Sequence, residues 1–182
     1  MWRKRTEIKA ESERTIKDLA RSRERTMNRA VRLLAAKPRS VAELRERLLE
    51  KSWTNAEIVN AIVEKLKEYK YLDDQQFASD LAVSKLRQKP QGKRSLQQIL
   101  SRKNLDREVI EGAIKSALEK IPEDELIDSA ISKRVRLKGR PETREDKKKF
   151  YDHLLRQGFS YDLIRRKMSM IAESNDDEDE TI

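Results

Sequence analysis

The chain has 182 residues, of which 36% are hydrophobic and 41% are charged. So small an apolar fraction argues against a single thick core, and the lack of cysteine excludes disulfides and thiolate metal sites. No apolar run approaches the ~18 residues of a membrane span, and the basic N-terminus lacks the apolar segment of a secretory signal. We therefore expect a soluble, cytoplasmic protein without a membrane partner.

The formal net charge is +9, but the charges are segregated along the chain. Residues 173–182 contain six acidic and no basic side chains, so the rest of the chain is more basic than the total indicates. We expect this segment to be an acidic disordered tail. A basic body of this kind indicates a polyanion or an acidic protein surface as its partner.

Residues 1–26 are rich in Arg, Lys and Glu and have few apolar positions. Glu13 and Lys17 make an i,i+4 pair that supports a helix. We therefore expect a charged, solvated helical extension before the first packed unit.

The rest of the chain is organised by five apolar positions that recur three times, first 52 and then 54 residues further on. The first set is Leu44, Leu48, Trp53, Ile58 and Ile62. The second set is Leu96, Leu100, Leu105, Ile110 and Ile114, and the third is Phe150, Leu154, Phe159, Ile164 and Met168. Self-similarity at this interval indicates tandem structural repeats.

Within each set, two apolar pairs lie one helical turn apart on either side of a break. Ser52, Asn104 and Gly158 stand where the first helix of each pair ends; Asn and Gly tolerate a left-handed conformation there, and Ser does so less well. A bulky apolar residue and then a residue suited to cap a helix follow each break. These caps are Thr54, Asp106 and Ser160.

Two helix starts in the first repeat match a capping box. They are Ser40 with Glu43, and Thr54 with Glu57. We interpret Trp53 as a packing residue at the corner between the helices, since the equivalent residues in the other repeats, Leu105 and Phe159, need not be aromatic.

A further helix precedes each pair. It ends near Pro38 in the first repeat and near Pro90 in the second, and it contains Ile127, Ile131 and Val135 in the third. The sequence therefore predicts an all-α fold of three tandem three-helix repeats that form an elongated, curved module. The predicted repeats are residues 27–71, 72–121 and 122–172.

The segment joining the first two repeats contains adjacent carboxylates, Asp73 and Asp74. Paired carboxylates can bind a metal or transfer protons. We favour a structural role, because Asp73 is placed to cap the next helix and both charges suit a helix N-terminus.

This same segment, Tyr71-Leu72-Asp73-Asp74 followed by Phe77-Ala78, resembles the hallmark stretch of the RecX family, bacterial regulators of the RecA recombinase. Three further stretches are similar to family motifs. They are Ala35 to Ser40 with Glu43-Leu44, Gly92-Lys93-Arg94, and Arg156-Gln157-Gly158-Phe159. The resemblance covers about Met27 to Ile171.

The resemblance implies a non-enzymatic, all-helical regulator of DNA repair and recombination that binds the RecA–DNA filament, inhibits recombinase activity and so modulates the SOS response. Its partners would be the filament, and single- and double-stranded DNA reached directly or through it. We expect a monomer without cofactors. The resemblance fixes no contact residues, so candidate contacts come from charge alone.

The clearest candidate contact surface lies between Lys85 and Lys103, where seven residues are basic and none is acidic. A solvated helix face is the alternative explanation, but unbalanced positive charges repel each other and a polyanionic partner would relieve the repulsion. The candidate contacts of the second repeat are Lys85, Arg87, Lys89, Lys93 and Arg94. The other repeats add Arg29, Arg32, Lys37, Arg39, Arg165 and Arg166.

Nothing in the sequence argues for catalysis, a metal or a cofactor. The one histidine, His153, has no metal-ligand or triad pattern around it, and we expect it to be a surface or half-buried residue. A helix-turn-helix nucleic-acid-binding protein is the alternative function, although Glu57 and Glu108 would place acidic side chains at the starts of its recognition helices. A basic helical-repeat scaffold for proteins is the third class.

Overall fold

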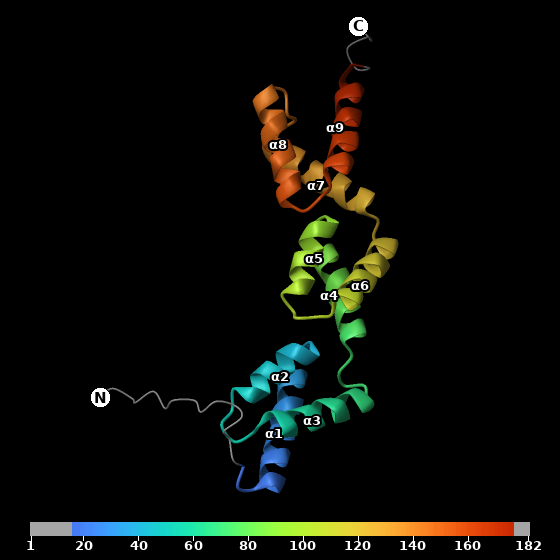
Figure 1. Ribbon diagram of the computed structural model, residues 1–182. Coiled ribbons are helices and arrows are strands. Elements are labelled where there is room, and N and C mark those ends of the chain that lie inside the picture. Colours follow the sequence, from blue (N-terminus) through green and yellow to red (C-terminus); the bar gives the residue numbers. More distant parts are fainter. Residues whose placement is uncertain (1–15, 177–182) are drawn as a thin grey trace, which may run out of the picture. The chain divides into compact units, whose positions relative to one another are not determined.

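The computed structural model describes residues 16–176 as helices joined by short turns (Figure 1). There are nine α-helices and no strand in this part of the chain, which confirms the all-α prediction. The bounds of the helices are α1 (Leu19–Ala36), α2 (Val41–Leu49), α3 (Ala56–Glu68), α4 (Asp74–Gln88), α5 (Lys93–Ser101), α6 (Arg107–Lys120), α7 (Glu123–Lys138), α8 (Arg144–Arg156) and α9 (Tyr161–Asp176). None of these helices combines the length and the apolar character that a membrane span requires.

The helices follow the three predicted groups of three: α1–α3, α4–α6 and α7–α9. By its contacts the chain divides into two compact units. Unit 1 contains the described residues up to Phe77 together with Lys103–Leu105, and unit 2 contains Ala78–Arg102 and the described residues from Asp106 onward.

The recurring apolar positions form the cores of these units. Thirteen of the fifteen side chains are buried, and the two exceptions, Trp53 and Met168, are half-buried. Burial of each such aliphatic or aromatic side chain stabilises the fold by about 1.5–3 kcal/mol. The repeated pattern is therefore a packing pattern, as predicted.

The first helix starts earlier than the predicted repeat boundary at Met27. Asp18 accepts a hydrogen bond from the backbone N–H of Arg21 at 2.9 Å and caps α1. Ser22 is buried, and its hydroxyl donates to the carbonyl oxygen of Trp53 at 2.5 Å, so this turn of α1 packs with unit 1. The first fifteen residues of the predicted extension lie outside the described residues.

The turns between the paired helices show some of the predicted helix-end conformations and N-caps, but not all of them. Asn104 and Gly158 adopt positive φ angles of 51° and 89°, as expected at a helix C-terminus, whereas Ser52 does not. Ser160 accepts from Leu163 N at 3.3 Å and caps α9 as predicted. Asp106 stands at the N-cap of α6 without a side-chain hydrogen bond.

The predicted cap of α3 is wrong by one residue. Asn55 is the N-cap, and its Oδ1 atom accepts from Ile58 N at 3.0 Å. Thr54 is buried instead, and its hydroxyl has no partner among the described residues, so it makes no capping box with Glu57.

At the chain's other end, α9 continues to Asp176, so the first residues of the predicted acidic tail have helical backbone. The remainder of that tail, 177–182, lies outside the described residues.

Candidate nucleic-acid and protein interface

The N-terminus of α2 is closed by four side chains of unit 1. Ser40 and Glu43 form the predicted capping box, in which Ser40 Oγ accepts from Glu43 N at 3.1 Å. The Ser40 hydroxyl also donates to the carbonyl oxygen of Lys103 at 2.7 Å, and Lys103 Nζ pairs with Glu43 Oε1 at 2.8 Å. Asp74 Oδ1 accepts from Val41 N at 2.9 Å. These contacts satisfy donors that a helix start leaves free.

The electrostatics of this cluster favour an ionised Glu43. Burial acts to raise the pKa of Glu43, but the hydrogen bond and the charge of Lys103 outweigh burial, so the pKa lies below its ordinary value. Glu43 is therefore a carboxylate at neutral pH, and it holds Lys103 against the start of α2.

The N-terminus of α5, in unit 2, is closed at the equivalent positions by backbone contacts. The backbone N–H of Gly92 donates to Gln157 O at 2.9 Å, and that of Arg94 donates to Gly158 O at 3.2 Å. Glu123 Oε1 accepts from Lys93 N at 2.9 Å, as Asp74 does from Val41.

Two glycines allow this close approach. A Cβ atom on Gly92 would lie 2.3 Å from the backbone carbonyl of Gly158, and one on Gly158 would lie 2.4 Å from Ser95 N. Gly92 has a φ of −81°, which suits any residue, so backbone conformation does not require a glycine here. The glycine is needed because another backbone packs against it.

The predicted basic stretch surrounds this junction. Lys85 and Arg87 lie in the last turn of α4, Lys89 follows that helix, and Lys93 and Arg94 begin α5. All are exposed except the half-buried Lys85, whose ammonium donates to Gln88 at 3.2 Å. The first turn of α5 has no acidic residue, so its two cations oppose the helix dipole at a cost of about 0.3–1 kcal/mol each.

The candidate contacts of the first repeat lie in unit 1. Arg32 and Lys37 are exposed. Arg29 pairs with Glu50 at 3.8 Å, and Arg39 donates to Leu33 O at 3.3 Å. Arg32 thus retains its charge for a partner, while Arg29 is partly neutralised.

A shallow basic cavity adjoins these residues. Arg25, Arg29, Arg32 and Trp53 line it, and the Arg25 guanidinium lies 4.4 Å from the centre of the Trp53 ring. Trp53 therefore fills the corner of unit 1 as interpreted, but a cation covers one face of its ring.

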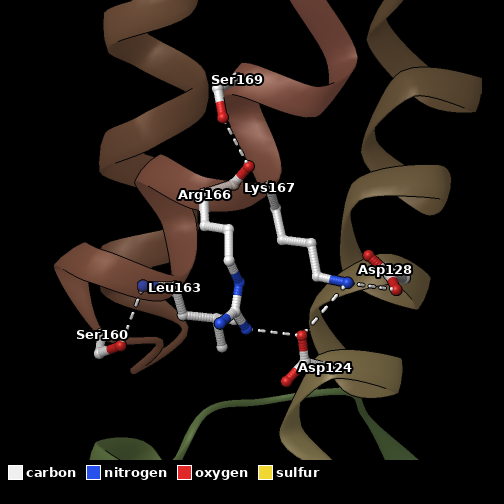
Figure 2. Close-up of polar contacts among 7 residues, drawn as sticks. All are labelled: Asp124, Asp128, Ser160, Leu163, Arg166, Lys167 and Ser169. Atoms are coloured by element: carbon white, nitrogen blue, oxygen red, sulfur yellow. Dashed lines mark hydrogen bonds and ion pairs between the residues drawn. The ribbon is translucent and has the colours of Figure 1, made fainter. Parts of the chain in front are cut away.

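In the third repeat, the two predicted contacts differ. Figure 2 shows Arg166 paired with Asp124 at 2.7 Å, and Lys167 lying between Asp124 and Asp128, at 3.4 and 2.7 Å. Burial acts to raise the pKa of Asp124, but the two cations hold it below its ordinary value. Arg165 is exposed. The pairing ties α9 to α7 and leaves Arg166 less charge to offer a ligand than Arg165.

The carboxylates in the linker have structural roles. Asp73 Oδ1 accepts from Gln75 N and Gln76 N at 2.8 and 3.0 Å and caps α4 as predicted. Asp74 instead caps α2, which the sequence analysis missed. The described residues contain no group of three or more side chains suited to hold a metal ion.

Together these features define a class: an all-α chain of three tandem three-helix repeats, in which residues of the second and third repeats close the N-terminus of the second helix of the preceding repeat. Models of a known family match all three units. They are the first three-helix domain of RecX at residues 27–66, the second at 73–114 and the third at 122–168. The chain belongs to the RecX family, as the sequence motifs predicted. The family comprises regulatory proteins and not enzymes.

Individual RecX proteins are also similar to this chain. The chain is 30% identical over 159 residues to the regulatory protein RecX of Bacillus velezensis, covering 86% of this chain and 59% of that one. It is 30% identical over 146 residues to RecX of Chlorobaculum tepidum, covering 80% and 87%. The crystal structure of RecX from Lactobacillus salivarius superposes with a TM-score of 0.75 at 21% identity, covering 85% and 99%. The chain thus spans about three-fifths of the Bacillus relative and most of the Chlorobaculum relative.

Proposed function

We propose that this chain binds the RecA–DNA filament and inhibits recombinase activity, with the cations around the start of α5 as contacts. Membership of a family of regulatory proteins named RecX supports the regulatory role. The observation that carries the contact surface is the placement of Lys93 and Arg94, exposed in the first turn of a helix whose dipole they oppose.

Placing Lys93 and Arg94 at this helix N-terminus lowers the stability of the fold. Residues that lower stability in this way are expected mainly at functional sites. The backbone around both residues is fixed, because Glu123 holds Lys93 N and Gly158 holds Arg94 N. Two long cationic side chains on a rigid base suit phosphate groups or a carboxylate-rich protein surface.

The helix-turn-helix alternative has less support. Its recognition helices would be α3, α6 and α9, and exposed acidic residues, Glu57 and Glu108, lie in the first turns of α3 and α6. In α9 Arg166 is already paired with Asp124. Only Arg165 remains as an exposed, basic candidate for base or phosphate contact there.

The test is RecA-dependent ATP hydrolysis on single-stranded DNA with this chain added in increasing amounts. We expect the chain to inhibit hydrolysis and the double variant Lys93→Gln/Arg94→Gln to need a higher concentration for the same inhibition. The matched control is Arg107→Gln/Lys120→Gln, which removes two exposed cations from α6 of the same unit.

The two parts of the proposal fail separately. Hydrolysis that does not respond to the parent chain contradicts the regulatory function. Equal inhibition by the parent and both double variants would mean that the regulatory surface lies elsewhere on the chain.

A further inference from the structure

Four protonatable side chains from three segments of unit 2 converge near the end of α8. Lys89 follows α4, Arg134 lies in α7, and His153 and Arg156 lie in α8. Burial lowers the pKa of His153, and the charges of Arg134, Arg156 and Lys89 lower it further. The geometry agrees: Arg134 lies against Phe150, one helical turn before His153, and Arg156 lies one turn after it on the same helix. The segment that follows Lys89 reaches the same end of α8, where Gly92 N donates to Gln157 O at 2.9 Å.

These cations lack acidic partners among the described residues. Lys67, Arg107 and Lys149 each form an ion pair with a carboxylate of their own helix, whereas no described carboxylate lies within ion-pair distance of Lys89, Arg134 or Arg156. Uncompensated positive charges in one place raise the free energy of the folded chain unless an anion binds there.

One buried donor of the cluster also lacks a hydrogen-bond partner within the described part of the chain. The guanidinium of Arg134 lies 5.9 Å from the centre of the Phe150 ring, and its Nε atom is buried without a hydrogen bond. Gln157 approaches His153 Nε2 through its own Nε2 at 2.9 Å. A buried N–H without an acceptor destabilises the fold, and an acceptor oxygen that reached it would remove this cost.

We propose that Lys89, Arg134, His153 and Arg156 form a binding site for a phosphate group. Two guanidinium groups supply planar pairs of donors that match phosphate oxygens, and the ammonium adds a point charge. The chemistry suits a phosphodiester of a nucleic-acid backbone or a free phosphate. The site is argued from the free chain and does not depend on contact with a recombinase.

Phosphate binding at this site should become stronger as the pH falls. The groups facing His153 are Arg134 from α7, Arg156 from its own helix and Lys89 from the segment after α4, and all three disfavour a charged imidazole. A bound phosphate reverses this, because a negative charge favours the imidazolium. Binding therefore takes up a proton and strengthens as the pH falls towards the ordinary pKa of His of about 6.5 and below.

Because the chain has one histidine, a single resonance reports on the site. We would follow the imidazole Cε1 proton by NMR against pH in the free chain, with a 20-nucleotide oligothymidine, and with inorganic phosphate. We expect a titration midpoint that rises when ligand is present. A rise with the oligonucleotide alone identifies a phosphodiester, and a rise with both identifies any phosphate. A midpoint unchanged by either ligand overturns the proposal.

Two variants distinguish phosphate binding at this site from non-specific attraction by the chain's net positive charge. Arg156→Gln and the control Arg107→Gln remove one exposed cation each from the same unit, but Arg107 lies on α6 and pairs with Glu111 at 2.7 Å. In fluorescence anisotropy with labelled oligothymidine, we expect Arg156→Gln to lower the log–log salt slope by about 0.7–1 unit and the control to leave it near the parent value. Equal effects of the two variants contradict a defined site.

The variant His153→Gln tests whether His153 is the group that takes up the proton on binding. It is expected to bind like the parent at pH 8, where the imidazole is neutral, and to lose the gain in affinity at pH 6. A variant that keeps the full gain would show that another group takes up the proton. These assays contain no recombinase, so inhibition of ATP hydrolysis by a chain that shows neither response would contradict this site while leaving the proposed function intact.

Discussion

The N-termini of α2 and α5 stand at equivalent places in successive repeats, yet they are closed by different chemistry. At α2 the Ser40 hydroxyl reaches Lys103 O, and Lys103 returns to pair with Glu43. At α5 the equivalent of Ser40 is Gly92, whose backbone meets Gln157 O and Gly158 directly. The junction at α2 is held by side chains, whereas the junction at α5 is held by backbone contacts together with the Glu123 side chain.

Because the two junctions are closed by different contacts, they should tolerate different substitutions. Side-chain hydrogen bonds and an ion pair can be weakened in steps by mutation, salt or acid. A contact between two backbones admits no added atom, because close-packed interiors cannot yield by an ångström without moving an element. We therefore expect abrupt losses in unit 2 and graded losses in unit 1.

The largest effect is expected from Gly158→Ala. The new Cβ would lie 2.4 Å from Ser95 N, and the φ of 89° strains any residue other than glycine. Strain of about 1–3 kcal/mol and overpacking of about 1–3 kcal/mol add to a loss of about 2–6 kcal/mol in the free energy of unfolding. Urea unfolding followed by far-ultraviolet circular dichroism measures it.

The control for this change is Gly112→Ala on α6. A Cβ at Gly112 would meet nothing within 4 Å, and the residue lies inside a helix. Alanine there should stabilise the chain by about 0.5–1 kcal/mol. If Gly158→Ala unfolds at the same urea concentration as the parent, the close backbone contact at α5 does not exist in solution.

The next largest loss in the free energy of unfolding is expected from Ser40→Ala, at about 2–4 kcal/mol. The change removes the cap of α2, worth about 1 kcal/mol, and leaves the carbonyl of Lys103 without its donor, at a further 1–3 kcal/mol or so. Both tryptophans precede Phe77 in the sequence, so tryptophan fluorescence during unfolding follows this part of the chain. Ser40→Thr, which keeps the hydroxyl, should recover most of the loss, and a threonine variant as weak as alanine would argue against the hydrogen bond.

The ion pair of the same junction should contribute about 1 kcal/mol and depend on pH. The pKa of Glu43 is lowered in the folded chain, so its contribution is present above the ordinary pKa of the carboxyl and is lost as the pH falls through the folded value. Lys103→Met should therefore lower stability at pH 7 and reduce the part of the acid sensitivity that comes from Glu43.

The exposed pair Lys67–Glu64 supplies the control for Lys103→Met. Lys67→Met is expected to change stability by less than about 0.5 kcal/mol at either pH. Thermal melts at pH 7 and pH 3, read by tryptophan fluorescence, distinguish the two variants. Identical pH profiles for Lys103→Met and the parent would contradict the role given to Glu43.

The smallest effect on stability concerns cations in the first turns of α5 and α6. Arg94→Gln should raise stability by about 0.3–1 kcal/mol at low salt, because it removes a positive charge from a helix N-terminus. Arg107→Gln, also in a first turn, should be near neutral, since it removes a dipole penalty and a pair with Glu111 together. Melting temperatures at low and high salt compare them, and destabilisation by Arg94→Gln would mean that Arg94 has a structural role.

The sequence predicted features that depend on local periodicity. The spacing of Leu44, Leu48 and their equivalents located the paired helices, because the buried residues of an amphipathic helix recur every three or four positions. The Ser40 capping box and the Asp73 cap were found for the same reason, since each involves residues three or fewer positions apart.

The features that the sequence did not predict are contacts between residues of different repeats. Asp74 and Glu123 reach back to cap α2 and α5, and Lys103 reaches Glu43, across gaps that no helical period spans. The signal that could have found the two caps is positional, since each carboxylate is the first residue of the next helical group. The contact between Arg134 and Phe150 was not predicted, because the two residues lie on different helices.

The proposed contact between the cations at the start of α5 and the recombinase filament is tested best by measuring binding directly. Fluorescently labelled chain would be titrated with RecA filaments on single-stranded DNA over a range of salt concentrations. If Lys93 and Arg94 each meet a phosphate, Lys93→Gln/Arg94→Gln should bind more weakly and lower the log–log salt slope by about 1.4–2 units, while Arg107→Gln/Lys120→Gln matches the parent. Equal affinities and slopes for the parent and both variants would contradict the claim.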